Sequence, residues 1–188
     1  MTPTQAHTAR MVASSRRPRV RRPALALRTA TAADAPHIHA LIDQHAEEGR
    51  LLPRRLDELT LHADRFVVAS ARSRVVACGE LAPLSLSVGE IRSFVVDEAV
   101  RHVGLGQLIV NELRRRARVD GFDRLCAFTH APSYFAKLGF SIVPHTWLPE
   151  KIATDCSACS LFRHCGQFAM LLDLDPVAQP GFEGMLSA

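Results

Sequence analysis

Apolar and polar residues follow two different periods along this chain, and together they predict a domain that mixes strands with helices. Runs with strand-like character, bounded by turn-forming residues, cover 24–29, 65–70, 75–84, 88–96, 124–128 and 167–172. Helical spacing marks the stretch after residue 31 and the segments 105–120 and 132–138. A helix between the fourth and fifth strands predicts an α/β fold, with a mixed, mostly antiparallel sheet covered by helices on both faces.

Caps and apolar faces define these helices further. Thr31 and Asp34 form an N-cap with an acidic residue three positions on, Gly49 ends that helix, and Pro53 predicts the first turn of another short helix. The inward residues of the first helix are expected to be Ile38, Leu41, Ile42 and His45. Those of the 105–120 helix are expected to be Leu105, Leu108, Ile109, Leu113 and Ala117.

Positive charge is concentrated at the start of the chain. Of the 23 Lys and Arg residues, seven arginines lie in 1–33, which contain no Asp or Glu, so 34–188 hold 16 basic and 19 acidic residues. Residues 1–23 also lack sustained periodicity, which predicts a disordered tail. We interpret this tail as a solvated extension, or as the result of a start codon placed too early, rather than as a transit peptide. A single domain over 24–175 and a short tail over 176–188 follow.

Hydropathy and charge also limit the partners. No apolar run approaches the ~18 residues that span a bilayer, and no signal-peptide pattern opens the chain, so we expect a cytoplasmic protein without a membrane partner. Because the domain itself is slightly acidic, we expect no nucleic-acid partner. A homodimer stays open.

Three of the five cysteines are clustered, and they form the strongest metal-like spacing in the sequence. Cys156 and Cys159 form a C-x-x-C pair, which lets two thiolates reach one tetrahedral ion, and Cys165 follows. No convenient fourth ligand adjoins them. A structural zinc, a redox pair and simple packing stay open, and we expect no metal.

Residues 95–107 combine a strand end, a tight turn and a helix start. Gly104 and Gly106 let the backbone approach a ligand closely, so that N–H groups at the positive end of the helix dipole face an anion. Arg101 and His102 lie where they add positive charge. A Rossmann site would need a third glycine three residues after the second, and a Walker loop would need Gly-Lys-Ser/Thr; both are absent here. The turn predicts a phosphate cradle, and a tight turn without a ligand is the alternative.

These residues resemble the GNAT N-acetyltransferase superfamily, whose signature R/Q-x-x-G-x-G/A matches 101–106 without a gap. Residues 134–140 look like its later motif, and the similarity covers about 25–173. The resemblance implies the GNAT fold and acetyl-CoA as co-substrate. It implies that the pyrophosphate is bound by Arg101, His102, Val103, Gly104, Leu105, Gly106 and Gln107. It also implies that the pantetheine arm pairs with Phe94, Val95 and Val96, where the 88–96 and 124–128 strands splay apart.

A narrower resemblance is carried by residues 48–55, 89–93 and 128–129, which look like the acetyltransferase domain of N-acetylglutamate synthase. The chain has no room for the amino-acid-kinase domain of the long synthases and is similar to the short, stand-alone form. The resemblance implies an amino-acid substrate, L-glutamate or L-glutamine, acetylated on its α-amino group in the first step of arginine biosynthesis.

Direct attack of an amine on a thioester needs no enzyme nucleophile, but it needs a base and donors for the developing oxyanion. The resemblance implies Glu90 as the base. Strand alternation puts Glu90 on the face of Arg92, Phe94 and Val96, and the alternative is a surface or ion-paired glutamate.

Arginine is suited to the substrate's carboxylates because its guanidinium is a planar bidentate donor. Arg54 and Arg92 are the expected partners, with Arg55 a competitor, and Thr129 is expected to donate a further hydrogen bond. Many GNAT enzymes protonate the leaving thiolate with a tyrosine at the position of Phe135. Tyr134 is adjacent but points about 100° away round a helix, so water is the expected proton source.

Other functions stay open from sequence alone. The same fold acts on other small amines or protein amino termini. A non-catalytic acetyl-CoA-binding regulator and a nucleic-acid adaptor that uses the basic tail are the alternatives from other classes.

Overall fold

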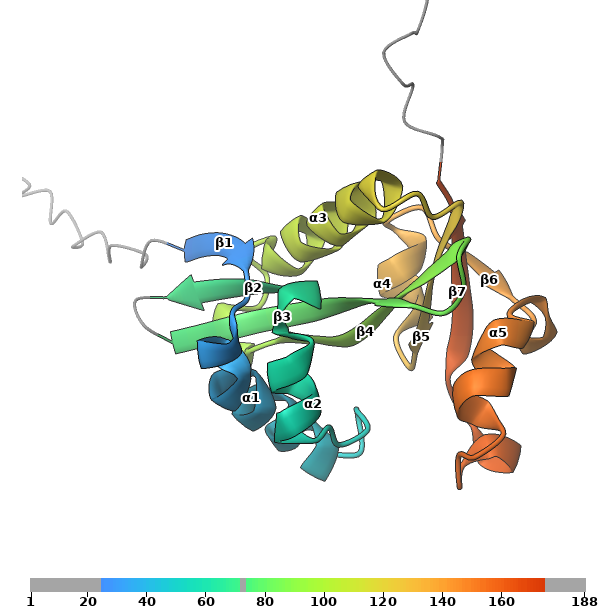
Figure 1. Ribbon diagram of the computed structural model, residues 1–188, viewed down its shortest axis with the longest axis horizontal. Coiled ribbons are helices and arrows are strands. Elements are labelled where there is room, and N and C mark those ends of the chain that lie inside the picture. Colours follow the sequence, from blue (N-terminus) through green and yellow to red (C-terminus); the bar gives the residue numbers. More distant parts are fainter. Residues whose placement is uncertain (1–24, 72–73, 175–188) are drawn as a thin grey trace, which may run out of the picture.

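The computed structural model describes residues 25–71 and 74–174 (Figure 1). Within these ranges seven strands form one sheet in the order β1-β2-β3-β4-β5-β7-β6. The strands are β1 (Leu25–Thr29), β2 (Phe66–Ala71), β3 (Arg74–Pro83), β4 (Val88–Val96), β5 (Arg124–Thr129), β6 (Ser141–Val143) and β7 (Phe168–Asp173). Only β4 and β5 pair in parallel; the other neighbours are antiparallel. The predicted mixed sheet is confirmed, and β6 was missed because three residues carry no readable period.

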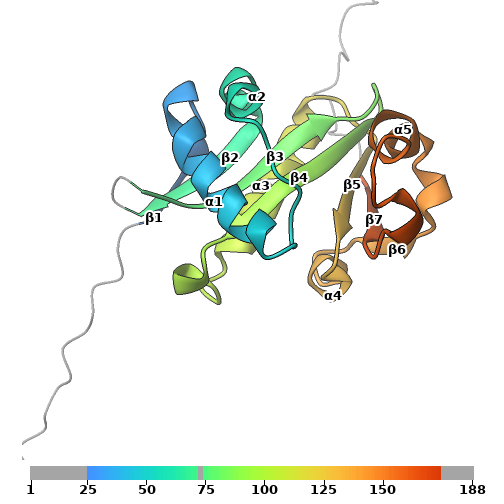
Figure 2. The same ribbon diagram turned by 90° about the horizontal axis from the view of Figure 1, so that it is seen from below.

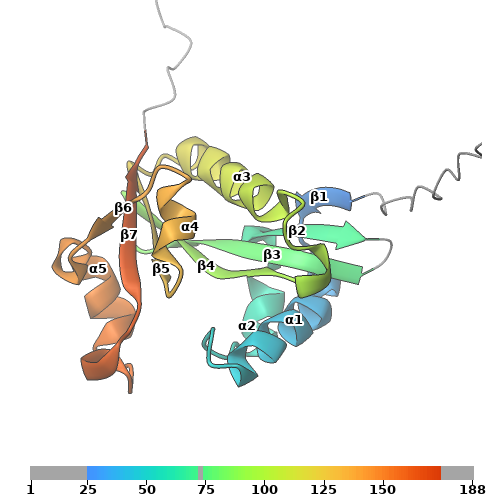
Figure 3. The same cartoon turned by 180° about the vertical axis from the view of Figure 1, so that it is seen from behind.

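Helices cover both faces of this sheet. They are α1 (Ala35–Glu47), α2 (Leu56–Leu61), α3 (Leu105–Val119), α4 (Pro132–Ala136) and α5 (Pro149–Lys151), which continues into a π-helical segment, Ile152–Cys156. The helices α1, α2 and α5 lie over one face (Figure 2), and α3 and α4 lie over the other (Figure 3).

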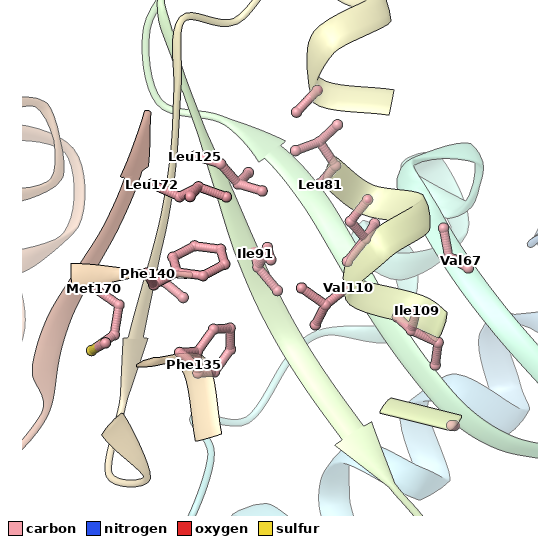
Figure 4. Close-up of a cluster of buried hydrophobic side chains, with 14 of the residues drawn as sticks. Val67, Leu81, Ile91, Ile109, Val110, Leu125, Phe135, Phe140, Met170 and Leu172 are labelled. Atoms are coloured by element: carbon pink, nitrogen blue, oxygen red, sulfur yellow. The ribbon is translucent and has the colours of Figure 1, made fainter. Parts of the chain in front are cut away.

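Three apolar clusters hold these layers together. The largest lies between the sheet and α3 with α4, where Ile109 and Val110 of α3 lie near Leu81, Ile91 and the rings of Phe135 and Phe140 (Figure 4). A second cluster lies under α1 and α2, and a third, around Leu148, lies under α5. Burying side chains of this size is worth about 1.5–3 kcal/mol each, so the clusters fix how α5 sits over β4 and β5.

A β-bulge interrupts the alternation of β4. Cys78 is paired with Val95 but Glu80 is paired with Arg92, so Ser93 and Phe94 lie opposite the single residue between them. Ser93 has a φ of 47°, in the left-handed region. The bulge places Phe94 and Val96 with Ile91 on the α3 face, while Glu90 and Arg92 face α2 and α5. The prediction that Glu90 and Arg92 share a face with Phe94 and Val96 is therefore wrong.

The same strand separates from β5 partway along its length. Pairing between β4 and β5 runs only from Val88 and Arg124 to Ile91 and Ala127. Beyond Ile91, β4 thus has no strand paired with it on its β5 side.

Two helix details differ from the predictions. Pro53 precedes α2 rather than opening it, since Arg55 is the N-cap. Leu108, expected to point inward, is 53% exposed, and Val110 is buried instead. Val110 lies about 160° round the helix from Leu108, on the side of α3 that packs on the sheet.

Boundaries at the chain ends stay predictions, because the predicted tails lie outside the described residues. No helix among the described residues is long and apolar enough to cross a membrane.

Candidate active site

The turn between β4 and α3 has the shape that an anion cradle requires. Gly104 is the N-cap of α3 with φ 83°, and it offers no side chain to cap the first turn. The first N–H groups of a helix have no intrahelical acceptor, so those of α3 are open to a ligand. His102, with φ 66°, and Val103 are exposed, whereas Leu105 is buried and anchors the helix start in the core.

The hydroxyl of Tyr134 points at this first turn. Its Oη is buried and has no hydrogen-bond partner, and it lies 2.5 Å from the place that a Cβ on Gly106 would take. The ring stacks on Phe94 at 5.7 Å between centroids. Burial raises the pKa of Tyr134, so the group remains a donor. A buried donor without a partner is costly unless a ligand satisfies it.

Arg101 is held at the base of the turn by three contacts. Its guanidinium donates to the Val96 carbonyl at 3.3 Å and to Glu98 at 2.7 Å, and Nη2 lies 3.4 Å from Nε2 of His45. The other ring nitrogen of His45, Nδ1, lies 3.1 Å from the Leu41 carbonyl, which can only accept. Nδ1 therefore carries the proton and Nε2 accepts from Arg101, so buried His45 positions this arginine.

These features fit the acetyl-CoA that the resemblance implies. The first turn of α3 offers N–H groups to a pyrophosphate, and the Tyr134 hydroxyl beside it has no hydrogen-bond partner. Beyond Ile91, β4 has no strand paired on its β5 side. A Cβ at Gly106 would lie 2.5 Å from the Tyr134 hydroxyl and 3.1 Å from the Phe94 ring, so a larger residue there would require Tyr134 to shift.

On the opposite face, Glu90 lies at the bottom of a cluster of charges. Its side chain is 3% exposed, and both oxygens are paired: Oε2 with Arg92 Nε at 2.5 Å and Oε1 with Lys151 Nζ at 2.6 Å. Asp155 joins the same two cations, bonded to Arg92 and lying 2.8 Å from Lys151. Lys151 also lies 5.2 Å above the centre of the Phe128 ring. Four charges from β4 and the α5 segment therefore converge at one point.

Arg54 reaches this region from the loop before α2. It donates to Glu58 at 2.7 Å, to buried Glu80 at 2.9 Å and to Ser93 of the bulge at 2.9 Å. Burial lowers the pKa of Arg54, but Glu80 and Glu58 outweigh burial and raise it overall. Glu80 is the register partner of Arg92, so the structure brings Arg54 and Arg92 together. Their role as partners of a substrate carboxylate stays a prediction.

The two arginines differ in what they still have to offer. Arg54 uses four of the five guanidinium N–H groups in its bonds to Glu58, Glu80 and Ser93, whereas Arg92 uses two. Burial lowers the pKa of Arg92, while Glu90 and Asp155 raise it by more. Arg92 is the better donor to an incoming carboxylate. Arg55 is 81% exposed and pairs only with Asp57 and so lies apart from the cluster.

Thr129 lies at the end of β5 and faces away from Glu90. By alternation it shares the face of Leu125 and Ala127, which belong to the α3 cluster. Its hydroxyl oxygen accepts from the Ala131 N–H at 3.0 Å, and its own proton is free to donate. Its role toward a substrate stays a prediction.

Lys151 and Asp155 were missed by the sequence analysis. They follow β4 by about sixty residues and belong to no motif that was recognised, although Lys151 is one of only two lysines in a chain rich in arginine. Their i,i+4 spacing on a helix was the available signal, and it is too common to be informative.

The clustered cysteines lie just beyond Asp155. Cys156 ends the π-helical segment, and the Cys159 N–H donates to its carbonyl at 3.1 Å across a turn. All three are free thiols, and burial raises the pKa of Cys156. Within the described residues no group of three or more His, Cys, Asp or Glu side chains is arranged to hold a metal ion. Cys78 and Cys126 are buried in the sheet, and burial raises the pKa of Cys78 to about 12.

Comparison with known proteins agrees with this geometry. The model of the acetyltransferase (GNAT) family matches residues 31–140. An uncharacterised N-acetyltransferase of Chlorobaculum tepidum is 29% identical over 79% of this chain and 96% of its own length. The amino-acid acetyltransferase of Mycobacterium tuberculosis is 35% identical over 69% of this chain and 75% of its own length.

A solved structure extends the comparison. The N-acetylglutamate synthase of Neisseria gonorrhoeae, complexed with coenzyme A and N-acetyl-glutamate, superposes with a TM-score of 0.73 at 25% identity. The match covers 82% of this chain but 36% of that one. The predicted fold and acetyl-CoA as co-substrate are thereby confirmed: this chain belongs to the acetyltransferase (GNAT) family.

Proposed function

We propose that this enzyme transfers acetyl from acetyl-CoA to the α-amino group of an amino acid, L-glutamate or L-glutamine, and so performs the first step of arginine biosynthesis. The observation that carries the proposal is the pair of cations, Arg92 and Lys151, beside buried Glu90 at the point where β4 leaves β5. A cationic pair beside a carboxylate matches an acceptor that carries a carboxylate next to an amine. Relatives and a structural neighbour that act on amino acids support the assignment.

In this proposal the two faces of the sheet have separate tasks. Acetyl-CoA supplies the acetyl group as an activated thioester. The N–H groups of residues 105–107, with Arg101, His102, Val103 and Gly104 around them, hold the pyrophosphate, and the Tyr134 hydroxyl adds a hydrogen bond. The free edge of β4 at Phe94, Val95 and Val96 aligns the pantetheine arm between the separated strands.

The acceptor is held on the face of Glu90. Arg92 and Lys151 bind its carboxylate, and the remaining N–H of Arg54 binds a second polar group. Once the two cations are shared with the acceptor, Glu90 has an oxygen free for the substrate ammonium and takes its proton. The neutral amine attacks the thioester carbonyl directly, so no enzyme nucleophile is needed. The carbon–sulfur bond breaks as the amide forms, and coenzyme A leaves as a thiolate that takes its proton from water.

A coupled assay tests the function directly. Thiol release from acetyl-CoA is measured with L-glutamate, L-glutamine, the other amino acids and simple amines such as butylamine. We expect turnover with glutamate or glutamine to exceed that with butylamine by at least about a hundredfold, since butylamine has no carboxylate to bind Arg92 and Lys151. Equal turnover of butylamine would contradict the proposal.

Another small amine as acceptor is the second candidate. It is compatible with the Chlorobaculum tepidum relative, which aligns over nearly its whole length and whose name specifies no acceptor. A cytoplasmic location and a homodimer stay predictions.

A further inference from the structure

The Glu90 cluster is layered from the core to the surface. Glu90 lies deepest with 3% of its side chain exposed, Lys151 and Arg92 follow with 14% and 25%, and Asp155 is outermost with 38%. Two cations are thus enclosed between a buried carboxylate and an exposed one. A ligand that arrives from solvent meets Asp155 first.

Asp155 binds the cations as a free carboxylate would. A single oxygen, Oδ2, accepts from both Arg92 Nη2 and Lys151 Nζ. Glu90 accepts from the same two cations on the buried side, through other N–H groups. The position that Asp155 occupies can therefore be filled by any carboxylate. An acceptor carboxylate has the same chemistry and the same two donors to gain.

The chain around Asp155 allows it to leave. It lies in the π-helical segment Ile152–Cys156, and its carboxylate makes no described bond besides those to Arg92 and Lys151. Rotation of its side chain toward water, which already reaches 38% of its surface, breaks these contacts without moving the core around Leu148. Displacement therefore costs the enzyme only the two ion pairs, which the acceptor replaces.

We propose that Asp155 is an internal competitor for the acceptor's carboxylate, occupying Arg92 and Lys151 in the free enzyme and yielding to the substrate. The inference rests on the proposed function. It makes Asp155 a specificity determinant, because an amine without a carboxylate has nothing with which to displace Asp155, whereas an amino acid exchanges one carboxylate for another.

The test measures binding without catalysis, with glutarate as the probe because it has two carboxylates and no amine. Isothermal titration of the full-length enzyme with coenzyme A bound compares wild type with Asp155→Asn. We expect the variant to bind glutarate on the order of tenfold more tightly. In wild type the site is occupied by Asp155 for most of the time, and the apparent Kd is the intrinsic Kd divided by the fraction of sites that are open.

A matched control separates the contact from the change of charge. Glu112→Gln on α3 also removes one negative charge paired with two arginines, at 2.8 Å and 3.2 Å, far from Glu90 in the fold. It should leave glutarate binding unchanged. The gain in Asp155→Asn should persist at about 0.5 M NaCl, where long-range fields are screened. Weaker or unchanged glutarate binding in Asp155→Asn, or a gain that disappears with salt, overturns the inference.

A second variant guards against a folding defect. Asp155→Ala should show the same gain, and both variants should bind coenzyme A as wild type does, because the cofactor turn lies on the other face. With an active acceptor, KM should fall while kcat stays constant; a residue that merely positioned Arg92 would give the reverse.

Failure of the two proposals can be told apart. Glutarate binding that tightens in an enzyme inactive on every amino acid would leave the competitor in place and remove the proposed function. Normal turnover of glutamate together with unaltered glutarate binding in Asp155→Asn would support the proposed function and rule out Asp155 as a competitor.

Discussion

The cofactor turn and the Glu90 cluster lie on opposite faces of one sheet, and they are made from different kinds of atoms. The turn is a continuous segment, 101–107, whose binding groups are backbone N–H groups set by Gly104 and Gly106. The cluster is made of side chains from β4 and the α5 segment, balanced so that each cation is already paired. A backbone site is sensitive to φ and to an added Cβ, whereas a side-chain site is sensitive to charge and to its neighbours.

Glu90→Gln should have the largest effect, because it removes the proposed base. We expect kcat to fall about a thousandfold, within the range for loss of general-base catalysis, while the affinity for coenzyme A stays that of wild type. Stopped-flow or steady-state thiol release measures the first and titration the second. The distant Glu112→Gln should change neither kcat nor the affinity for coenzyme A. Full turnover of Glu90→Gln between about pH 6 and 9 would show that another group, or water, takes the proton.

Arg54→Met tests how far the side-chain face depends on charge balance. It leaves Glu80, 2% exposed, without its cation, and breaking such a buried pair lowers the free energy of unfolding by about 3 kcal/mol. Arg116→Met is the control, since Arg116 is similarly covered, at 16% exposed against 13%, but its partner Glu112 is 25% exposed. Denaturant unfolding should show a much smaller loss of unfolding free energy in Arg116→Met than in Arg54→Met. Equal losses would mean that burial of Glu80 does not matter.

The sequence indicated the shape of the turn but only part of the cluster. The turn is formed by neighbouring residues, whereas the cluster depends on a bulge and on contacts between distant segments. Gly104 and Gly106 act within a few residues of each other, so their spacing alone carries the geometry. Glu90 and Arg92 were identified, but the bulge at Ser93 reverses which face Phe94 shares with them, and an inserted residue cannot be read from alternation. Lys151 and Asp155 reach Glu90 only because Leu148 packs α5 against the sheet, a contact between distant segments.

Gly104→Ala tests the backbone side of the comparison and has a matched control, Gly121→Ala, just beyond the other end of α3. Gly104 and Gly121 have φ of 83° and 82°, and a Cβ at either would meet nothing within 4 Å. Each change should cost about 1–2 kcal/mol of stability through the left-handed conformation. Only Gly104→Ala should also weaken coenzyme A binding, by about tenfold, because only this glycine precedes the N–H groups that bind phosphate. Equal affinities in the two variants would place the cradle elsewhere.

Tyr134→Phe is the mildest change and distinguishes a cofactor contact from a structural one. The buried hydroxyl has no partner in the free protein, so its removal should leave the melting temperature unchanged or raise it slightly. Coenzyme A binding should weaken by about fivefold, a loss near 1 kcal/mol that is typical of one hydrogen bond. A double-mutant cycle with Gly106→Ala adds a second measurement. The new Cβ would lie 2.5 Å from Tyr134 Oη, so Gly106→Ala should lower the melting temperature less when Tyr134 is replaced by Phe. A lower melting temperature with unaltered affinity would instead assign the hydroxyl to the fold, and the first turn of α3 would then bind its ligand through the backbone alone.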